Sequence, residues 1–192
     1  MSYTAIPAED LDVVVARLSE IPWCAKLLSA PDQVVVIHPS RIFRNSKTDT
    51  YFGSALKTEE TISNFVLLYK NGATPNSPVE EAKAIFTIGG GLNGFPDIVH
   101  GGMVASLMDE VMGFLSVQNR IIGATRQGKY MTVYLNTQFK APLMANSTYL
   151  AVARVDKLEE RKIFISQTIQ DGEGKVLATG DALFINVVRP KL

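Results

Sequence analysis

The sequence has few of the residues that hold disulfides or metal ions. Among 192 residues there are one cysteine, Cys24, and two histidines. A single thiol cannot form a disulfide within the chain, and no Cys and His cluster has the spacing of a zinc site. We therefore expect a reducing compartment, no metal ion and no cofactor.

An excess of either charge is also missing. Nineteen basic and nineteen acidic side chains give a formal net charge of zero. A general nucleic-acid binder needs a basic excess to neutralise phosphates, so we expect no nucleic-acid partner. No apolar run approaches the ~20 residues that span a bilayer. The early residues are acidic, unlike a presequence. These features predict a cytoplasmic protein without a membrane span, with a mitochondrial location left open.

The first third of the chain predicts helices followed by irregular structure. Apolar residues recur at helical spacing over residues 10–18. Pro22 favours the start of a second helix, which ends near residue 28. Residues 34–37 predict a short strand or an extended arm, and residues 41–60 a loop. We interpret residues 1–60 as an N-terminal extension, helical and then irregular, of one domain that spans residues 61–192.

The remainder predicts an antiparallel sheet and one long helix, which is an α+β class. The helix is expected over residues 102–117. The links between the last four strands are too short for helical crossovers, so these strands should be antiparallel. Residues 171–174 have the composition of a hairpin turn. The expected strands are residues 65–69, 82–88, 131–139, 148–156, 162–170 and 175–188.

The predicted helix has two different faces. One is a wide apolar stripe that should pack against the sheet. The other is a stripe of small residues interrupted by one carboxylate, Asp109, two turns inside the helix. Desolvation of that carboxylate costs free energy unless a polar group meets it. Asp109 is therefore either a functional group or a residue that points to water beside Glu110. The small residues are Gly102, Ala105, Gly113 and Ser116.

His100, Gly101 and Gly102 stand at the expected start of this helix. The first N–H groups of a helix lack internal acceptors, and glycine lets a ligand approach them closely. Such donors suit an oxyanion, where each contributes ~3 kcal/mol to a transition state. The alternative is a glycine pair that only makes a tight turn. We favour His100 as a cap or loop anchor over an acid–base group, and we expect His38, which precedes Pro39, on the surface.

The expected strand 131–139 alternates between apolar odd positions and mostly polar even positions, so it should have one apolar face. Thr132 lies on the polar face. Its hydroxyl can hold a water molecule because it both donates and accepts hydrogen bonds. The alternative for a strand threonine is a residue that only favours the extended backbone.

Two runs together resemble the hotdog-fold acyl-CoA thioesterases. GFPDIVHGGMVASLMDE, residues 94–110, resembles a signature shared by the phenylacetyl-CoA thioesterase and long-chain mitochondrial thioesterase branches. MTVYLNTQFKAP, residues 131–142, resembles the long-chain branch. The resemblance covers residues 82–188. It implies a curved antiparallel sheet wrapped around one central helix, and a dimer whose sheets join edge to edge, which would also cover an exposed sheet edge.

The resemblance also implies roles for individual residues. The catalytic carboxylate of the family falls on Asp109, and its oxyanion donors fall on the backbone of Gly101 and Gly102. Its water-positioning hydroxyl falls on Thr132, expected from the partner subunit. Some relatives carry an asparagine where this chain has Gly94, one residue after Asn93. The candidates for substrate binding are His100, Asn93, Ala105, Met108, Gly113 and Lys140.

The function implied is hydrolysis of a fatty or aromatic acyl-CoA in lipid metabolism, by a homodimer or a dimer of dimers. Asp109 would act as general base or as nucleophile. A non-catalytic acyl-CoA or lipid-binding module on the same fold is the main alternative. An enoyl-CoA hydratase is less favoured, because the paired Asp and His of that chemistry do not match its pattern here.

Overall fold

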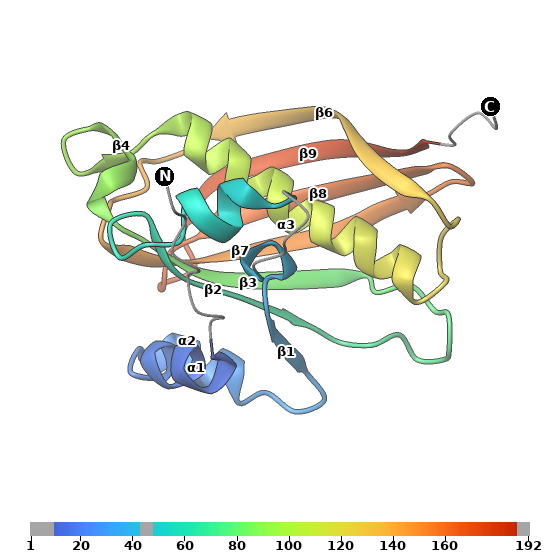
Figure 1. Cartoon of the computed structure of the whole chain (residues 1–192), viewed down its shortest axis with the longest axis horizontal. Helices are drawn as coiled ribbons and strands as arrows, with labels where there is room; N and C mark the ends of the chain where they lie inside the picture. The colour runs from blue at the N-terminus through green and yellow to red at the C-terminus, as the bar shows by residue number, and fades with distance from the viewer. Residues whose placement is uncertain (1–9, 43–47, 188–192) are drawn as a thin grey trace.

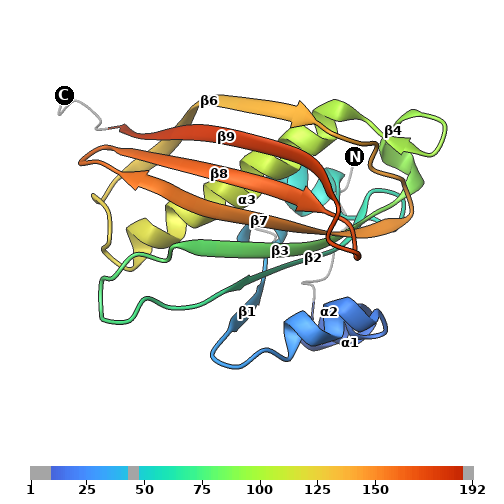
Figure 2. The same cartoon turned by 180° about the vertical axis from the view of Figure 1, so that it is seen from behind.

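A computed structural model of the chain describes residues 10–42 and 48–187. One curved seven-stranded antiparallel sheet wraps around one long helix, α3, as Figures 1 and 2 show from opposite sides. The strand order is β1-β2-β3-β7-β8-β9-β6. The strands are β1 Val34–Ile37, β2 Ile62–Tyr69, β3 Glu81–Ile88, β6 Lys129–Phe139, β7 Ser147–Leu158, β8 Lys162–Gln170 and β9 Val176–Val187; the helices are α1 Leu11–Ser19, α2 Pro22–Leu28 and α3 Gly101–Ile121. The predicted α+β architecture is confirmed.

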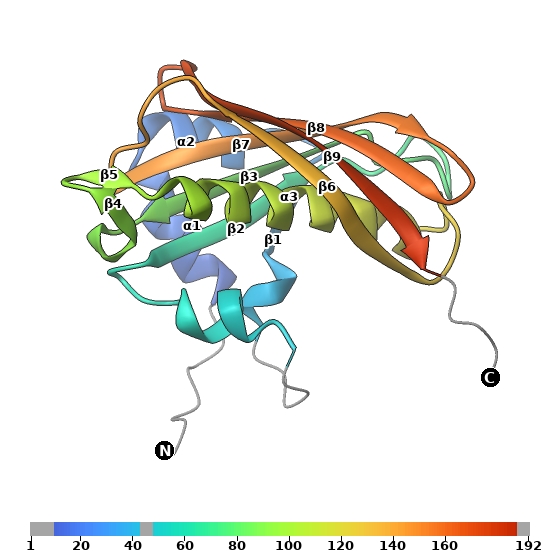
Figure 3. The same cartoon turned by 90° about the horizontal axis from the view of Figure 1, so that it is seen from above.

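The concave face of the sheet packs on the apolar stripe of α3, with the helix beneath the sheet in Figure 3. The stripe predicted from the sequence is buried throughout, and Leu107, Met108 and Val111 have no exposed surface. The helix runs one turn further than predicted. It ends before Gly123, whose positive φ of 80° suits the left-handed end of a helix.

The outer face of β2 and β3 is covered by α1 and α2. Val66, Leu68 and Ile85 point to this side, while their neighbours on the same strands point to α3. This alternation follows from the two-residue period of a strand. Cys24 of α2 lies in this second cluster, where burial raises the pKa of its thiol to about 12.

The short link at residues 140–146 does not join neighbouring strands, which corrects the expected pairing. β6 pairs with β9, whereas β7 pairs with β3 and β8. Three strand spacings amount to ~14 Å, and seven extended residues can reach ~23 Å. The link therefore crosses the end of the sheet and leaves β6 at the edge.

The N-terminal extension contributes more structure than the sequence indicated. β1 pairs with β2, so the extension adds a strand to the sheet. The expected loop 41–60 contains a π-helix, η2 Tyr51–Ala55, and it follows a short 3-10 helix, η1 Pro39–Arg41. Buried Arg41 donates to the carbonyls of Leu56 and Ile62, which fixes the segment against the sheet. The division at residue 60 stays a prediction.

A small hairpin precedes α3 where the sequence indicated only a turned connection. It consists of β4 Asn93–Phe95 and β5 Ile98–Val99, after the short helix η3 Gly90–Leu92. Backbone bonds from Val99 to Leu143 and from Ala145 to Asp97 fasten the hairpin to the 140–146 link. The chain therefore enters α3 from a fixed direction.

No helix in the described parts of the chain combines the length and the hydropathy that a bilayer crossing requires.

Asn119 fastens the last turn of α3 to the 70–80 loop. Its amide accepts from the N–H of Val79 and donates to the carbonyls of Val79 and Leu115, at 2.9, 2.9 and 3.0 Å. We expect Asn119→Ala to lower the free energy of unfolding by about 2–3 kcal/mol, because both Val79 groups lose their partner in a buried place. Urea unfolding measures this change. A loss below about 0.5 kcal/mol would contradict the assignment.

Candidate functional site

Asp109 of α3 accepts a hydrogen bond from the Thr132 hydroxyl of β6, with 2.8 Å between the two oxygens. Both residues belong to the same chain, whereas the resemblance led us to expect Thr132 from the partner subunit. Asp109 is half-buried. A half-buried carboxylate with one neutral donor keeps lone pairs free for a water molecule or a substrate.

A β-bulge explains why Thr132 faces the helix. The pairing of β6 with β9 skips Val133, between Thr132 and Tyr134. The extra residue reverses the alternation along the strand. Thr132 before the bulge and Thr137 after it therefore both face α3, where the Thr137 hydroxyl lies 3.9 Å from the sulfur of Met108. The predicted single apolar face of this strand is wrong.

His100 is the N-cap of α3, as we favoured. Its Nδ1 accepts from the N–H of Gly102 at 2.9 Å. This bond occupies one of the two N–H groups expected to bind an oxyanion. Among the hydrogen bonds of residues 10–42 and 48–187, none uses the N–H of Gly101. Only Gly101 therefore offers a free amide at the helix start, which corrects the expected pair of donors.

Gly101 and Asp109 are too far apart to meet one small group within a single chain. Eight residues of α-helix span ~12 Å. For hydrolysis, the water oxygen held at Asp109 must lie about 3 Å from the carbonyl carbon whose oxygen is held at Gly101. The two halves of the predicted site therefore do not meet within one chain.

The remaining predicted residues fall into three groups. Ala105 and Gly113 are half-buried on the Asp109 side of α3, while Met108 is fully buried in the core. Asn93 is exposed in β4. Lys140 is exposed and donates to Gln138. Ser116, expected on the small-residue face, is fully buried instead.

The β6 edge of the sheet exposes apolar side chains. Met131, Val133 and Phe139 are 59%, 56% and 58% exposed. An edge strand with unpaired backbone groups and apolar side chains is a surface on which another strand can pair. The edge lies directly beside Asp109, because Thr132 belongs to it.

Sequence reasoning missed a buried polar cluster on the opposite side of α3. His38 is 3% exposed, so its expected surface position is wrong. Its Nε2 lies 3.3 Å from the carbonyl of Glu110, its Nδ1 lies 2.8 Å from the Ser40 hydroxyl, and a Glu110 carboxylate oxygen lies 3.5 Å from Nδ1. No spacing in the sequence brings residues 38 and 110 together, since the contact depends on β1 reaching α3.

Burial sets the protonation of this cluster. It lowers the pKa of His38 to about 3, with a bond to the Glu110 backbone opposing the shift and Arg41 adding to it. Burial also raises the pKa of Glu110 to about 7; the Ser40 hydroxyl opposes this rise, and the charges of Asp109 and Asp49 add to it. His38 is therefore neutral at pH 7, and Glu110 titrates near neutrality.

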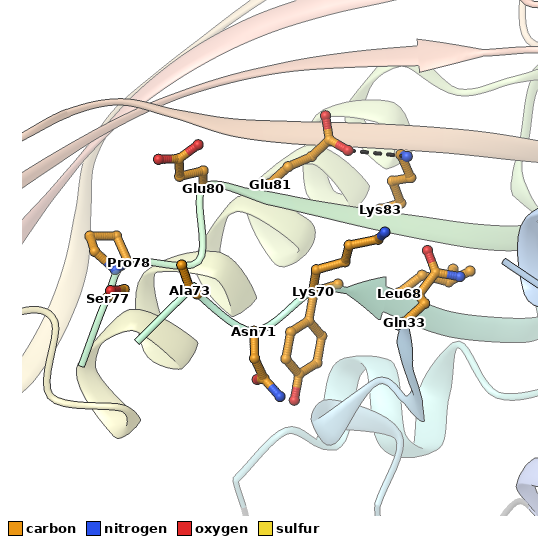
Figure 4. A pocket seen from close by; sticks show the side chains of 12 residues that line it. Gln33, Leu68, Lys70, Asn71, Ala73, Ser77, Pro78, Glu80, Glu81 and Lys83 are labelled. Carbon is orange, nitrogen blue, oxygen red and sulfur yellow. Dashed lines mark ion pairs between the residues drawn. The ribbon is translucent and has the colours of Figure 1, made fainter. Parts of the chain in front are cut away.

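The surface of the described residues has several hollows, of which two bear on the location of the site. Figure 4 shows one of about 510 Å³, where the 70–80 loop meets β2 and β3, with Glu81 paired to Lys83 at 3.1 Å. Asp109 and Thr132 are not part of it. The other, of about 990 Å³, lies between the end of α3 and the start of β6, with Val117, Arg120 and Met131 in its wall. It shares its helix and its strand with the Asp109 site.

Residues 97–178 match the model of the thioesterase superfamily. The chain is 29% identical over 160 residues to the mouse acyl-coenzyme A thioesterase THEM4, which covers 78% of this chain and 66% of that protein. It is 33% identical over 113 residues to rat THEM4, covering 58% and 46%. A crystallised thioesterase-superfamily protein superposes with a TM-score of 0.51 at 24% identity, covering 64% of this chain and 54% of that one. The chain thus spans less than two thirds of these relatives' length, and the structural likeness confirms the predicted hotdog fold.

The half-buried carboxylate of Glu110 in this cluster predicts a pH-dependent stability. The folded-state pKa of Glu110 lies above its ordinary value of 4.5. The stability that Glu110 contributes to the folded state is therefore fully present below pH 4.5 and is lost as the pH rises through about 7. Glu110→Gln removes the charge and keeps the shape. We expect its free energy of unfolding, relative to that of the unmodified chain, to be higher at pH 8 than at pH 5 by on the order of 2 kcal/mol. Urea unfolding at both pH values measures it, and equal differences at the two would refute the shift.

Proposed function

We propose that this chain, whose residues 97–178 match the model of the thioesterase superfamily, hydrolyses the thioester of a fatty or aromatic acyl-CoA to the free acid and CoA. The observation that carries the proposal is a half-buried carboxylate, Asp109, fixed by Thr132 beside an exposed sheet edge. The similarity to THEM4, named an acyl-coenzyme A thioesterase, supports the choice of substrate class.

In the proposed reaction Asp109 acts as general base. It takes a proton from a water molecule, and the water oxygen attacks the carbonyl carbon of the thioester. The Thr132 hydroxyl holds the carboxylate in place through the 2.8 Å bond. The C–S bond then breaks, and the CoA thiolate leaves with the electron pair and takes up a proton. Attack by Asp109 itself, through a mixed anhydride, is the covalent alternative.

The oxyanion would be stabilised by Gly101 of a second chain. Within one chain the ~12 Å of helix between Gly101 and Asp109 prevents joint action. Antiparallel pairing of two β6 edges would cover Met131, Val133 and Phe139 and bring two α3 helices side by side. Each site of this homodimer would combine Asp109 and Thr132 of one protomer with the Gly101 amide of its partner.

The acyl group would lie beside α3, between the two protomers. Ala105 and Gly113 leave space on either side of Asp109. The hollow of about 990 Å³ continues along the same helix past Val117. Arg120, Arg126 and Lys129 line that hollow, and Lys140 is exposed at the far end of β6. These cations would meet the CoA phosphates.

We expect Asp109→Asn to lower kcat about 10³-fold, because a general base contributes 10²–10⁴-fold, with KM and the melting temperature little changed. Thr132→Ala should lower kcat roughly tenfold. Thr132→Ser should keep most of the original kcat, because serine retains the hydroxyl. Thiol release from acyl-CoA measures each variant. Turnover of Asp109→Asn near the level of the unmodified chain would overturn the role of this carboxylate.

Mixed dimers test the division of the site between chains. Gly101→Pro removes the free amide, and proline suits this first helical position after the extended His100; Gly101→Ala retains the amide and serves as its control. A dimer of one Asp109→Asn chain and one Gly101→Pro chain keeps one intact site, so about half of the activity should return.

Dimers of Asp109→Asn with Thr132→Ala should recover no more than the activity of Thr132→Ala, because Asp109 and Thr132 act from the same chain. Recovery of about half of the unmodified activity in this second pair would show that Thr132 acts from the partner. Absence of recovery in the first pair, with dimers intact, would refute the shared site.

A further inference from the structure

Helix α3 is held from two sides at consecutive residues. On one side Asp109 meets Thr132 of the edge strand β6 at 2.8 Å. On the other side Glu110 meets the N-terminal arm, which we define as residues 34–41, comprising β1 and η1. Side chains at neighbouring helical positions point about 100° apart. A contact at Glu110 therefore fixes the rotation of the helix that also directs Asp109.

The contacts of the arm form one consistent hydrogen-bond network. A carbonyl can only accept, so the His38 Nε2 that lies 3.3 Å from the Glu110 carbonyl carries the proton. The opposite nitrogen, Nδ1, then accepts from the backbone N–H of Ser40 at 3.3 Å. The His38 ring stacks on Phe65 of β2, with 4.5 Å between ring centroids. The imidazole is thus held by the sheet and is not free to follow the helix.

Nothing in a hotdog core requires this arrangement. Apolar side chains at positions 38 and 110 would fill the same space without the desolvation of a carboxylate. A buried polar network costs stability, so its presence directly behind a half-buried carboxylate needs an explanation other than packing. The neighbouring residue, Asp109, is the carboxylate that would face the substrate.

We propose that Glu110, held by His38 and Ser40 of the N-terminal arm, is a positioning residue that directs Asp109 toward Thr132 and the substrate. This inference rests on the proposed hydrolysis, and it gives residues 34–41 a part in the reaction. Glu110 does not touch the thioester. It acts through the rotation of α3 and through its charge.

The charge has a direct consequence for proton transfer. Within the described residues, the charged and titratable groups that act on Glu110 are His38 of the arm, Asp109 of the helix and Asp49 before η2, while Arg41 of the arm acts on His38. His38 is neutral at pH 7 because burial lowers its pKa to about 3. Ionised Glu110 thus places a second negative charge beside Asp109, which favours transfer of the proton from the attacking water to Asp109. Since the pKa of Glu110 is raised to about 7, kcat should rise through neutrality.

The test compares three variants of the full chain. Glu110→Ala removes the carboxylate that meets Ser40, together with its charge, and keeps the backbone carbonyl that His38 meets. Glu110→Gln removes only the charge, and Asn119→Ala weakens the same helix at its far end. We expect Glu110→Ala to lose about tenfold in kcat with an unchanged KM. Glu110→Gln should keep kcat within about twofold at pH 6 and lose the rise of kcat near pH 7. Asn119→Ala should keep both kcat and the pH profile at a temperature where it is folded.

If Glu110→Ala does not fold, Ser40→Ala removes the hydroxyl of the arm that meets the Glu110 carboxylate. This variant should also lower kcat. Equal kcat and equal pH profiles in the unmodified chain, Glu110→Gln and Glu110→Ala would overturn the inference, as would a loss in Asn119→Ala as large as in Glu110→Ala.

The inference and the proposed function fail in different ways. An unmodified chain that releases no thiol from any acyl-CoA refutes the hydrolysis, and with it the part of Glu110 in it. Normal thiol release with a pH profile that Glu110→Gln leaves unchanged refutes the inference alone. An NMR titration of the Glu110 carboxyl carbon gives its pKa without any substrate, and a value near 4.5 would remove the source of the predicted rise.

Discussion

The geometry of one straight helix constrains the whole account. α3 carries the free amide of Gly101 at its start and the carboxylate of Asp109 eight residues later, and the helix keeps them ~12 Å apart. Neither group alone makes a hydrolytic site, because water must be activated at the place where the oxyanion is held. In the proposed homodimer, pairing of two exposed β6 edges would set two α3 helices side by side and bring the two groups together. Catalysis and assembly would then depend on the same strand.

The strand and the helix are matched to one another by small irregularities. The bulge at Val133 turns Thr132 toward Asp109, and without it the hydroxyl would face away from the helix. The cap from His100 takes the Gly102 amide and leaves the Gly101 amide free. The arm that carries His38 holds the opposite side of α3. Each irregularity costs regular structure locally and fixes the direction of one polar group.

The sequence predicted those features that depend on local patterns. The apolar stripe of α3 and six strands with bounds within two residues followed from periodicity and composition. The resemblance singled out Asp109 and Thr132, but it placed Thr132 in the partner subunit and not beside Asp109 of the same chain. Features that depend on distant contacts were not predictable. The position of β6 at the edge depends on a link that crosses the sheet. The burial of His38 depends on β1 joining the sheet, which its position before Pro39 did not indicate. The bulge has no signal in an ordinary run of strand residues.

The most direct measurement is thiol release by the unmodified chain across a panel of acyl-CoAs, short to long and including an aromatic one. The account predicts release of free thiol in equal amount to free acid, catalytically and for a limited range of acyl groups. Tight binding of acyl-CoAs with no thiol released from any of them would contradict it and would identify the chain as a binding module.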